Sequence, residues 1–480
     1  MSEDLIFKSA IDQAELVRSG AVSARELVEG SLAAIDRLNE ELNAVVTRCD
    51  ERALSEADSV AAGDERPLAG VPLLVKDLGA VTAGVRTTMG MRALGEWVPD
   101  FDSATVRRLR GAGAIVVGKT NLPELGILPV SEPARFGPAR NPWDTSRTPG
   151  GSSGGSAAGV AAGIVSIAHG NDGGGSIRIP ASCCGLVGLK PSRGRVSWGP
   201  HLGELVSGFA TEGVLTRTVR DSALGLDLLS GYETGDPYWA PSPSAPFIDA
   251  VDREPGKLRV AFTADSPNGV PVDPDCVAAT REAAELLESL GHEVQEVQIE
   301  ADEGYVPNFI TVWIGGTANE VATWSRISGQ ELDIEQLEPL ARQMYDMSLE
   351  LSATDYLRAL DWLHDYSRQL IAMWDGIDVL LTPTLALPPI EIGALEPKED
   401  EPPIQMLMNS ATWVPFTPVW NVTGQPAISL PLHQTAGGLP VGVQLVGPPA
   451  GEELLISLSA QIEAARPWAD RRPALAVASR

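Results

Sequence analysis

Apolar residues near the start of the chain recur at the spacing of one helix face. Leu27, Leu32 and Leu38 would line up on one side of a helix, and the segment SARE at residues 23–26 ahead of them has the form of an N-terminal capping box. We therefore predict a pair of helices over about residues 5–45.

Farther along the chain, short apolar runs alternate with helical patterns. The predicted strands are 114–117, 258–262, 293–299 and 441–446, and the predicted helices are 103–111, 276–290 and a segment from about 452. Strand, helix and strand in this order and at these lengths are typical of a layered α/β sheet. Two segments rich in proline and acidic residues, 231–256 and 386–404, are predicted to be long surface loops. The pattern favours one large α/β domain with insertions.

The chain has a strong excess of acidic residues. Of its 480 residues, 64 are Asp or Glu and 36 are Lys or Arg, which gives a formal net charge of −28. A surface of this charge repels phosphate backbones and anionic lipids, so we expect neither nucleic acid nor a membrane as a partner. We expect a monomer or a homodimer.

The cysteines and the N-terminal segment indicate a cytoplasmic chain. Four cysteines are too few for a disulfide framework in a chain of this length, and the adjacent Cys183 and Cys184 lack the spacing of a zinc knuckle or a redox pair. The first residues contain neither the basic region nor the apolar region of a secretion signal, and no run reaches about 18 apolar residues. We expect reduced, buried thiols.

Two glycine-rich clusters stand in the middle of the chain, TPGGSSGGS at 148–156 and GNDGGGSIRIPASCCG at 170–185. The first has the composition of a flexible linker, but it leads directly into residues 157–168, which are apolar enough for a buried helix followed by a strand. It also lacks the GK[ST] ending of a P-loop and the GxGxxG spacing, which disfavours phosphate binding without removing it.

Ser176 follows three consecutive glycines, a setting that suits a catalytic nucleophile. An unhindered backbone lets several N–H groups point at one place, as a tetrahedral oxyanion requires. The N–H groups of Gly173, Gly174, Gly175 and Ser176 are therefore candidates for an oxyanion hole, and Ser176 could attack a carbonyl whose oxygen they hold.

A serine nucleophile also needs a base. The chain has five histidines, and the nearest of them, His169, closes an apolar run and is expected in the core. Lys76 follows the apolar run at 70–75, where poor solvation would lower its pKa and leave it neutral enough to accept a proton. The simpler alternative is that Lys76 pairs with the adjacent Asp77 at the end of a strand.

Several segments resemble the amidase signature family of serine hydrolases. They are GVPLLVKDL, GKTNLPELG, NPWDTSRTPGGSSGGSAAGVAAG, GNDGGGSIRIPASCCGLVGLKPSRGRVS, FTPVWNVTGQPAISLP and GLPVGVQLVG. The resemblance covers nearly the whole chain and is strongest over 64–200 and 415–473. It implies an α/β fold with a large mixed, mostly parallel β-sheet covered by helices on both faces.

The resemblance also implies how the chain is organised. One domain would span residues 1–480. After the N-terminal helical pair it would contain a catalytic core at about 64–220, a divergent substrate-specificity region at about 231–410 and a C-terminal return to the core at about 411–475.

The family carries a Ser–cis-Ser–Lys triad, and each of its positions has a match here. The nucleophile falls on Ser176, the bridging serine on Ser152 and the base on Lys76. The bridging serine of the family follows a cis peptide bond, which here would join Gly151 and Ser152. The resemblance implies proton transfer from Ser176 through Ser152 to neutral Lys76 and then to the leaving nitrogen, with no metal or cofactor.

Three residues beside the triad are expected to support it. Ser153 either hydrogen-bonds to the relay or caps the helix that follows. Asp172 and Arg178 flank the nucleophile and are expected to brace its loop as a charge pair.

Two details depart from the commonest family pattern. KDL stands in place of KDN, and GNDGGGS in place of GTDTGGS, but neither change touches the three triad positions. The central segment is more similar to the branch that holds 6-aminohexanoate cyclic-dimer hydrolase and other broad amidases. The resemblance thus implies cleavage of a carboxylic amide C–N bond in a small or oligomeric amide, anilide or carbamate, with esterase or urethanase side activity. The alternatives are an ammonia-delivering glutaminase subunit of an amidotransferase complex and a non-catalytic scaffold.

Aromatic residues in divergent or loop-like segments are candidates for a substrate pocket. Trp313, Trp413, Phe416 and Trp420 are predicted to line an apolar pocket for an aryl or alkyl acyl group. Ordinary core packing is the alternative for each of them.

Overall fold

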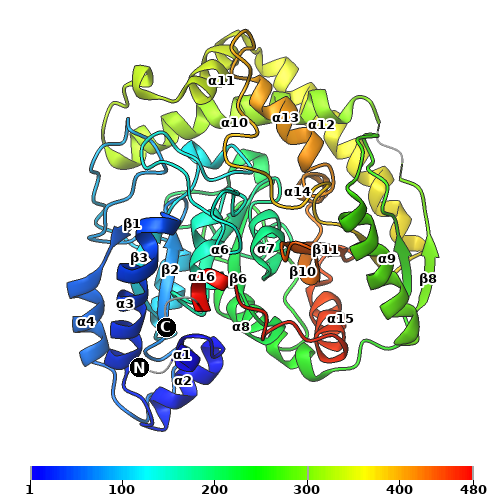
Figure 1. The fold of residues 1–480 in the computed structure, drawn as a ribbon. Helices are drawn as coiled ribbons and strands as arrows, with labels where there is room; N and C mark the ends of the chain where they lie inside the picture. The colour runs from blue at the N-terminus through cyan, green and yellow to red at the C-terminus, as the bar shows by residue number, and fades with distance from the viewer. Residues whose placement is uncertain (1–2, 300–301, 478–480) are drawn as a thin grey trace.

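One mixed β-sheet runs through the chain. The computed structural model describes residues 3–299 and 302–477, and within these residues eleven strands form a single sheet in the order β1-β3-β2-β4-β6-β5-β10-β11-β9-β7-β8 (Figure 1). The strands are β1 (Val45–Arg48), β2 (Pro72–Lys76), β3 (Ile115–Thr120), β4 (Ile167–Asp172), β5 (Val187–Lys190), β6 (Thr211–Thr216), β7 (Arg259–Phe262), β8 (Glu293–Glu296), β9 (Val379–Pro383), β10 (Ala427–Gln434) and β11 (Pro440–Val446).

Helices surround the sheet. The α-helices are α1 (Glu3–Ile6), α2 (Ala10–Arg18), α3 (Ala24–Leu42), α4 (Asp50–Asp58), α5 (Ala104–Gly111), α6 (Gly154–Ala161), α7 (Arg178–Cys184), α8 (Val219–Leu229), α9 (Pro274–Ser289), α10 (Tyr305–Ser328), α11 (Pro339–Glu350), α12 (Ala353–Ile371), α13 (Gln405–Trp413), α14 (Val419–Thr423), α15 (Glu452–Ala465) and α16 (Ala474–Val477). Short 3₁₀ helices lie at Glu124–Gly126, Val206–Gly208, Phe247–Asp252, Ile334–Gln336 and Ala372–Asp375. Helices α10 to α13 lie together at the top of Figure 1.

The sheet is mixed, but its parallel pairs are the minority. Within the described residues, four of the ten neighbouring pairs are parallel and six are antiparallel. The expectation of a mostly parallel sheet is therefore wrong in this detail. Parallel pairs occur where a helix crosses back over the sheet, as α5 does between β2 and β3, whereas β10 and β11 form a short antiparallel hairpin.

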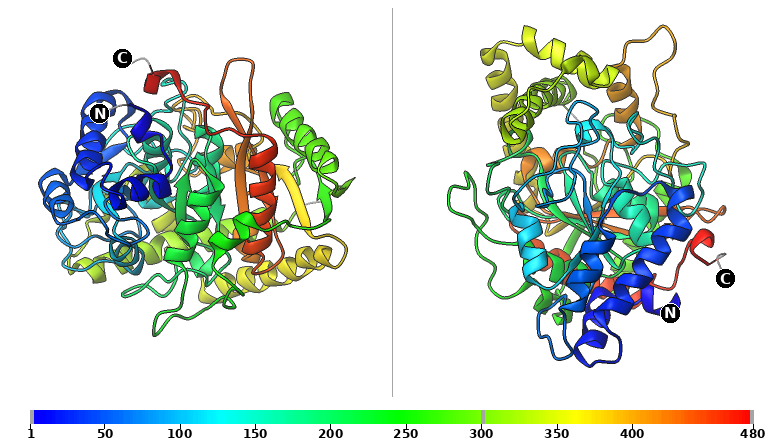
Figure 2. Two further views of the ribbon diagram at one scale, coloured as in Figure 1. Left: turned by 90° about the horizontal axis from the view of Figure 1, so that it is seen from below. Right: turned by 90° about the vertical axis from the view of Figure 1, so that its left-hand side faces the viewer.

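Both faces of the sheet are covered (Figures 1 and 2). On β11, Gly442 faces α7, since an added Cβ would lie 2.7 Å from Ser182 Oγ of that helix. Val441 and Val443 point the other way and pack in a core that includes residues of α9 and α15. The left view of Figure 2 shows α15 side by side with α8 on this face. Because side chains along each strand point alternately to the two faces, one apolar core forms on each side of the sheet.

The side chain of Lys76, the last residue of β2, points to one of the two sides of the sheet. Leu73 and Val75 belong to the apolar cluster that includes residues of α5, whereas Leu74 points at α6, where an added Cβ on Gly159 would lie 2.6 Å from Leu74 Cδ1. Because side chains along a strand alternate, Lys76 points to the same side as Leu74. The glycine cluster that leads into α6 lies on that side.

Most elements predicted from the sequence are confirmed. Ser23 and Glu26 form the reciprocal capping box of α3, and the predicted strands and helices coincide with β3, β7, β8, β11, α5, α9 and α15 to within a few residues. The glycine cluster is not a linker, because residues 148–162 are all buried. The predicted loops at 231–256 and 386–404 contain mainly turns and irregular backbone.

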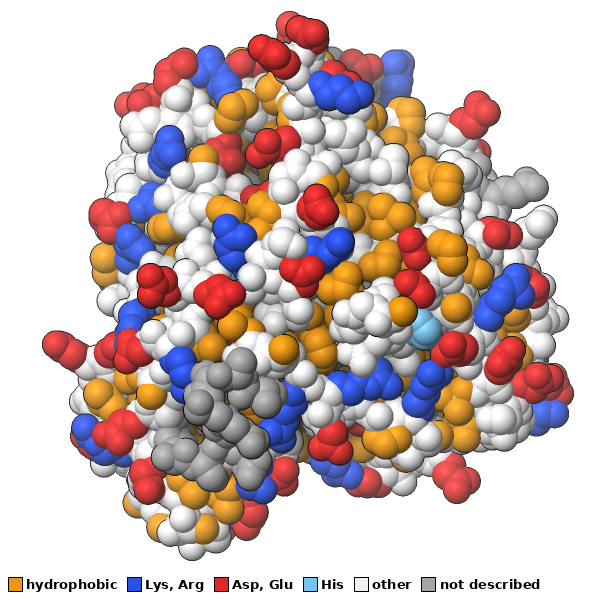
Figure 3. Space-filling view, viewed as in Figure 1, with side chains coloured by type: hydrophobic (Ala, Val, Ile, Leu, Met, Phe, Trp, Pro, Cys, Tyr) orange, Lys and Arg blue, Asp and Glu red, His pale blue; other side chains and the backbone are white. Residues whose placement is uncertain are grey.

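The acidic composition is visible on the surface. The face shown in Figure 3 carries many acidic side chains, with Lys and Arg scattered among them. All four cysteines are buried and none is in a disulfide, as expected. Across the described ranges, no helix is both long and apolar enough to cross a membrane.

A substitution at Gly155 can test how closely α6 packs against the backbone next to β1 and β3. A Cβ there would lie 2.5 Å from Ala44 O and from Asn121 N, which are backbone atoms that cannot move aside as a side chain can. We expect Gly155→Ala to lower the free energy of unfolding by about 1–3 kcal/mol, measured by urea denaturation. The control is Gly111→Ala at the end of α5, where a Cβ meets open space and we expect no loss of stability. Equal effects of the two substitutions would contradict the close approach.

Candidate active site

The amine of Lys76 is buried between two neutral oxygen atoms. Lys76 ends β2 and its side chain is fully buried. Its Nζ lies 2.6 Å from Ser152 Oγ and 2.5 Å from Asn171 Oδ1, and the Asn171 amide nitrogen donates to Leu78 O (2.9 Å). Asn171 is thereby held with its carbonyl oxygen toward the amine, and the Ser152 hydroxyl is the hydrogen-bonding partner that can exchange a proton with it.

Burial determines the charge of this amine. Desolvation lowers the pKa of Lys76 to about 7, although the nearby carboxylates of Asp172, Glu212 and Glu320 act in the opposite direction. A large fraction of Lys76 is therefore neutral near neutral pH, which is the state that can accept a proton.

The adjacent Asp77 is not the partner of Lys76. Asp77 Oδ1 lies 3.1 Å from Lys119 Nζ, and Asp77 Oδ2 accepts hydrogen bonds from the N–H and the hydroxyl of Thr88 (3.0 and 2.5 Å). The simple pairing of Lys76 with Asp77 is thus excluded, since consecutive residues of a strand point to opposite sides. The Asp77 carboxylate instead fixes the turn that follows β2.

The first glycine cluster holds Ser152 in place. The Gly151–Ser152 peptide bond is cis, as the resemblance implies. The hydroxyl of Ser131 donates to Gly150 O (3.0 Å) and accepts from Gly154 N–H (3.1 Å), so one side chain bridges both ends of this turn. A Cβ on Gly151 would lie 2.6 Å from Val130 N, which shows how close the neighbouring backbone comes. The cluster is a packed support for a serine hydroxyl.

Ser153 ties the two glycine clusters together. Its hydroxyl donates to Asn171 O (3.2 Å) and its N–H donates to Ser176 O (3.3 Å). It stands at the N-cap position of α6 but makes no side-chain cap hydrogen bond, so the capping alternative is wrong. Nor does its hydroxyl bond to Ser152 or Lys76; its contacts position the backbone on either side of them.

A fully buried ion pair braces the loop that carries Ser176. Asp172 and Arg178 are joined at 2.8 Å with both side chains inaccessible, as predicted. Arg178 also donates to Gln444 Oε1 (2.7 Å) and Asn421 Oδ1 (2.6 Å), and Asn421 donates to Asp172 Oδ1 (2.9 Å). Burial alone would raise the pKa of Asp172, but the charge and hydrogen bonds of Arg178 hold it well below its usual range. The loop is therefore fixed by permanent charges.

The N–H groups of the second glycine cluster divide into two kinds. The Gly175 N–H donates to Asp172 Oδ1 (2.8 Å), so this donor is already engaged, and its expected place in an oxyanion hole needs correction. Among the described residues, none accepts a hydrogen bond from the N–H of Gly173, Gly174 or Ser176. Three donors therefore remain for a ligand.

A large apolar pocket opens beside Ser176. It encloses about 1260 Å³ including its mouth, and Trp313, Phe416 and Trp420 line it as predicted. Trp413 does not: it is 1% exposed, packs in a hydrophobic core and donates from Nε1 to Leu387 O (3.1 Å). This prediction is wrong because the indole points away from the pocket into the body of the protein.

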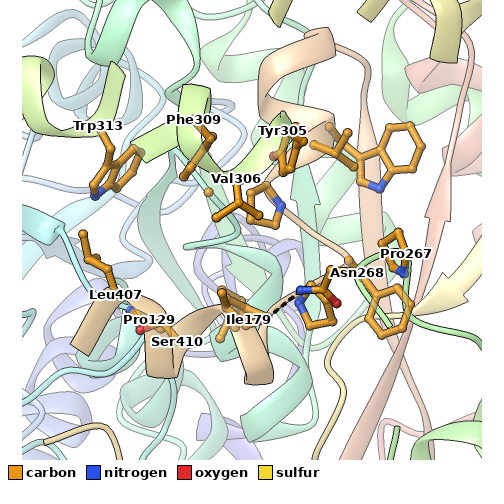
Figure 4. Close-up of a pocket in the computed structure, with 18 of the residues that line it drawn as sticks. Pro129, Ile179, Pro267, Asn268, Tyr305, Val306, Phe309, Trp313, Leu407 and Ser410 are labelled. Atoms are coloured by element: carbon orange, nitrogen blue, oxygen red, sulfur yellow. Dashed lines mark hydrogen bonds between the residues drawn. The ribbon is translucent and has the colours of Figure 1, made fainter. Parts of the chain in front are cut away.

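The helix that forms one wall of this pocket was not predicted from the sequence. Tyr305, Phe309 and Trp313 follow one another at four-residue intervals on α10, with ring centroids 5.9 and 5.4 Å apart. Figure 4 shows them in a row with Val306, facing Leu407 of α13 across the pocket. The four-residue spacing of these aromatic residues in the sequence could have predicted an aromatic face on this helix.

A second, smaller cavity lies on the other side of the serines. It measures about 400 Å³ including its open mouth and is lined by Ser152, Ser176 and Asn171, together with Thr317 and Glu320 of α10. Ser176 also lines the large pocket, whereas Ser152 does not. The two spaces thus meet at Ser176, and only the smaller one reaches Ser152.

The titratable residues around the site are dispersed. Glu212 Oε1 lies 3.5 Å from Nε2 of His169, which is fully buried in the core as expected. Glu320 lies on α10 near the Trp324 indole, and Asp172 is paired with Arg178. In the described part of the chain, no group of three or more His, Cys, Asp or Glu residues is arranged to hold a metal ion.

Comparisons with known proteins identify the family of the chain. The family model named Amidase matches residues 26–456. The chain is 39% identical to the 6-aminohexanoate-cyclic-dimer hydrolase of Pseudomonas sp. (strain NK87), over 100% of this chain and 99% of that protein. A solved structure of 6-aminohexanoate cyclic dimer hydrolase superposes with a TM-score of 0.93 at 38% identity, covering 98% of this chain and 99% of that one.

A more distant solved structure has the same fold. A bacterial aryl acylamidase described as belonging to the amidase signature enzymes superposes with a TM-score of 0.84 at 29% identity, over 96% of this chain and 97% of that one. The protein belongs to the amidase signature family of amide-hydrolysing enzymes.

Proposed function

We propose that the protein cleaves its amide substrate through a serine acyl-enzyme, with Ser176 as nucleophile, Ser152 as proton relay and Lys76 as base. One observation carries this proposal: a buried amine with a pKa of about 7 lies 2.6 Å from the Ser152 hydroxyl. Ser152 and Ser176 line the same small cavity, which supports a relay between them.

The first half of the reaction forms the acyl-enzyme. Ser176 Oγ bonds to the carbonyl carbon as its proton passes to Ser152, and the Ser152 proton passes to the neutral Nζ of Lys76. The N–H groups of Gly173, Gly174 and Ser176 stabilise the resulting oxyanion. The C–N bond then breaks while Ser152 gives a proton to the leaving nitrogen and is itself reprotonated by Lys76.

The second half repeats these steps with water. Water loses a proton to Ser152, and thus to Lys76, as its oxygen bonds to the acyl carbon. The ester bond to Ser176 breaks, the proton returns to Ser176 Oγ, and the carboxylic acid leaves. Each cycle therefore consumes one water molecule and leaves Lys76 neutral again.

We propose that the acyl part of the substrate occupies the large pocket. Its lining carries no charged side chain among the described residues and presents aromatic rings from α10. An aliphatic or aryl acyl group fits this lining, including the acyl part of a linear or cyclic aliphatic oligoamide like that named for the relative from Pseudomonas sp. (strain NK87). Anilides, carbamates and esters with such acyl groups are further candidates for the same route.

The pocket also weighs against the alternatives. Glutamine carries an ammonium and a carboxylate, and an apolar lining would desolvate both charges without pairing them, which disfavours a glutaminase subunit. A non-catalytic scaffold has no use for a buried lysine held beside a serine hydroxyl. Both alternatives predict that the isolated chain lacks amidase activity.

Ser176 is tested by covalent labelling. We expect a fluorophosphonate probe to label the wild type, and Ser176→Ala to abolish labelling and to lower kcat for hexanoyl amides by at least about 10³-fold, because the nucleophile is gone. The control is Ser59→Ala, an exposed serine at the end of α4, which we expect to label normally. Labelling that persists in Ser176→Ala would assign the nucleophile elsewhere.

Lys76 is tested by the pH dependence of hydrolysis. The base must be neutral, and its neutral fraction grows as the pH rises through about 7. We therefore expect kcat/KM to rise about tenfold per pH unit below this value and to level off above it. In Lys76→Met we expect kcat/KM to fall about 10²–10⁴-fold and no longer to rise with pH below about 7. The exposed Lys257 provides the control, since Lys257→Met should keep the whole profile. A rise of kcat/KM with pH that persists in Lys76→Met would refute the role of Lys76 as the base.

Phe309 is tested by varying the length of the acyl chain. We expect Phe309→Ala to lower kcat/KM for hexanoyl amides about tenfold or more and to lower it less for acetyl amides, because the longer chain covers more of the ring. Trp413→Phe is the control: it should lower the melting temperature and leave the chain-length preference unchanged. A uniform loss across all chain lengths in Phe309→Ala would count against an acyl site here.

A further inference from the structure

Glu320 is a buried carboxyl group that the proposed mechanism does not use. It lies on α10, one turn after Thr317 and two turns after Trp313, so all three side chains share one face of the helix. This face lines the small cavity beside Ser152. Glu320 is 5% exposed, and its Oε2 has no hydrogen-bond partner among the described residues.

The other polar groups of the small cavity are already engaged. Asn171 binds Lys76 with its oxygen and donates from its nitrogen to Leu78 O. The Thr317 hydroxyl donates to Trp313 O (3.0 Å). The remaining wall is largely apolar. Glu320 is the acidic side chain that lines this cavity, and although the Trp324 indole lies nearby, its Oε2 has no hydrogen-bond partner among the described residues.

The proton relay decides which part of a substrate enters this cavity. If Ser152 protonates the leaving nitrogen, that nitrogen must lie beside Ser152 Oγ, and Ser152 lines the small cavity but not the large pocket. The leaving group would then occupy the small cavity while the acyl group occupies the large pocket. This step rests on the function proposed above.

We propose that Glu320 is a specificity-determining residue that binds a protonated amine on the leaving group. The enzyme then favours amides of short diamines over amides of alkylamines of the same length. Apolar walls around a single acid match a short aliphatic chain that ends in an ammonium group. The 400 Å³ includes the open mouth of the cavity, so the space beside Ser152 holds only a small leaving group.

Charge balance in the cavity agrees with this assignment. Burial raises the pKa of Glu320 to about 8, against the opposing effects of the Trp324 indole and of Lys76, so the empty site holds a neutral acid. When an ammonium binds, Glu320 gives its proton to solvent and forms an ion pair that is neutral overall. The paired carboxylate then adds little to the field at Lys76, and the base stays uncharged.

The test compares two hexanoyl amides of equal leaving-group length, the propyl amide and the aminoethyl amide. We expect wild type to favour the aminoethyl amide in kcat/KM by about tenfold or more, and Glu320→Gln to remove most of that preference while still hydrolysing the propyl amide. Glu463→Gln is the control: Glu463 is partly buried and burial raises its pKa to about 7, but it accepts a hydrogen bond from Val219 N–H on α8. It should keep the wild-type ratio.

A second measurement does not depend on any variant folding. Ethylenediamine should inhibit hydrolysis by the wild type at concentrations about tenfold lower than propylamine, because only the diamine carries the second ammonium. Equal kcat/KM ratios in wild type and Glu320→Gln, or equal inhibition by the two amines, would overturn the assignment of Glu320 while leaving the amidase mechanism intact. If wild type hydrolyses neither amide and Ser176→Ala behaves as wild type does, the proposed mechanism fails as well.

Discussion

The site depends on one constraint: a lysine amine is buried with neutral partners only. Ser152 and Asn171 give Lys76 hydrogen bonds without giving it a counter-charge, and burial then favours the neutral amine. Strand β2 brings the amine to the side of the sheet where α6 begins. The turn before α6 presents a hydroxyl to it, and neutral Asn171 on β4 completes the shell. A carboxylate in place of either partner would keep the amine charged and unable to act as a base.

Two other buried cations beside the site show the opposite arrangement. Lys119 has Asp77 at 3.1 Å, and Arg178 has Asp172 at 2.8 Å with further hydrogen bonds to uncharged side chains. These ion pairs fix two loops beside the site. Lys76 has no such paired carboxylate. Lys190 is likewise buried, donates to Pro191 O and has its pKa lowered to about 7, so a buried lysine without a counter-charge is not confined to the site.

Much of the site could be predicted from the sequence because its residues stand in local motifs. Lys76 after an apolar run, Ser152 within a glycine cluster and Ser176 after three glycines are each visible in a short segment. The ion pair of Asp172 and Arg178 could be predicted for the same reason, since both residues belong to the loop that they brace. The sheet was recognised as mixed, but its strand directions depend on long connections whose crossings leave no local pattern.

The missed features depend on tertiary packing. The role of Asn171 follows from β2 and β4 lying side by side, which no local pattern indicates. Glu320 lies far from the triad in sequence, and only the packing of α10 brings it to the small cavity. Trp413 was misplaced because a tryptophan in a divergent segment packs equally well into a core or a pocket. Gly175 was misassigned because its N–H turns back to Asp172, a contact that depends on the exact course of the loop.

The claim that Lys76 is neutral near neutral pH can be measured directly. The chain has only six lysines, so NMR of protein with isotope-labelled lysine side chains can follow each amine, and the signal absent from Lys76→Met identifies this one. We predict that this signal titrates near pH 7. An amine that stays protonated up to about pH 10, the value of an ordinary lysine, would contradict the account.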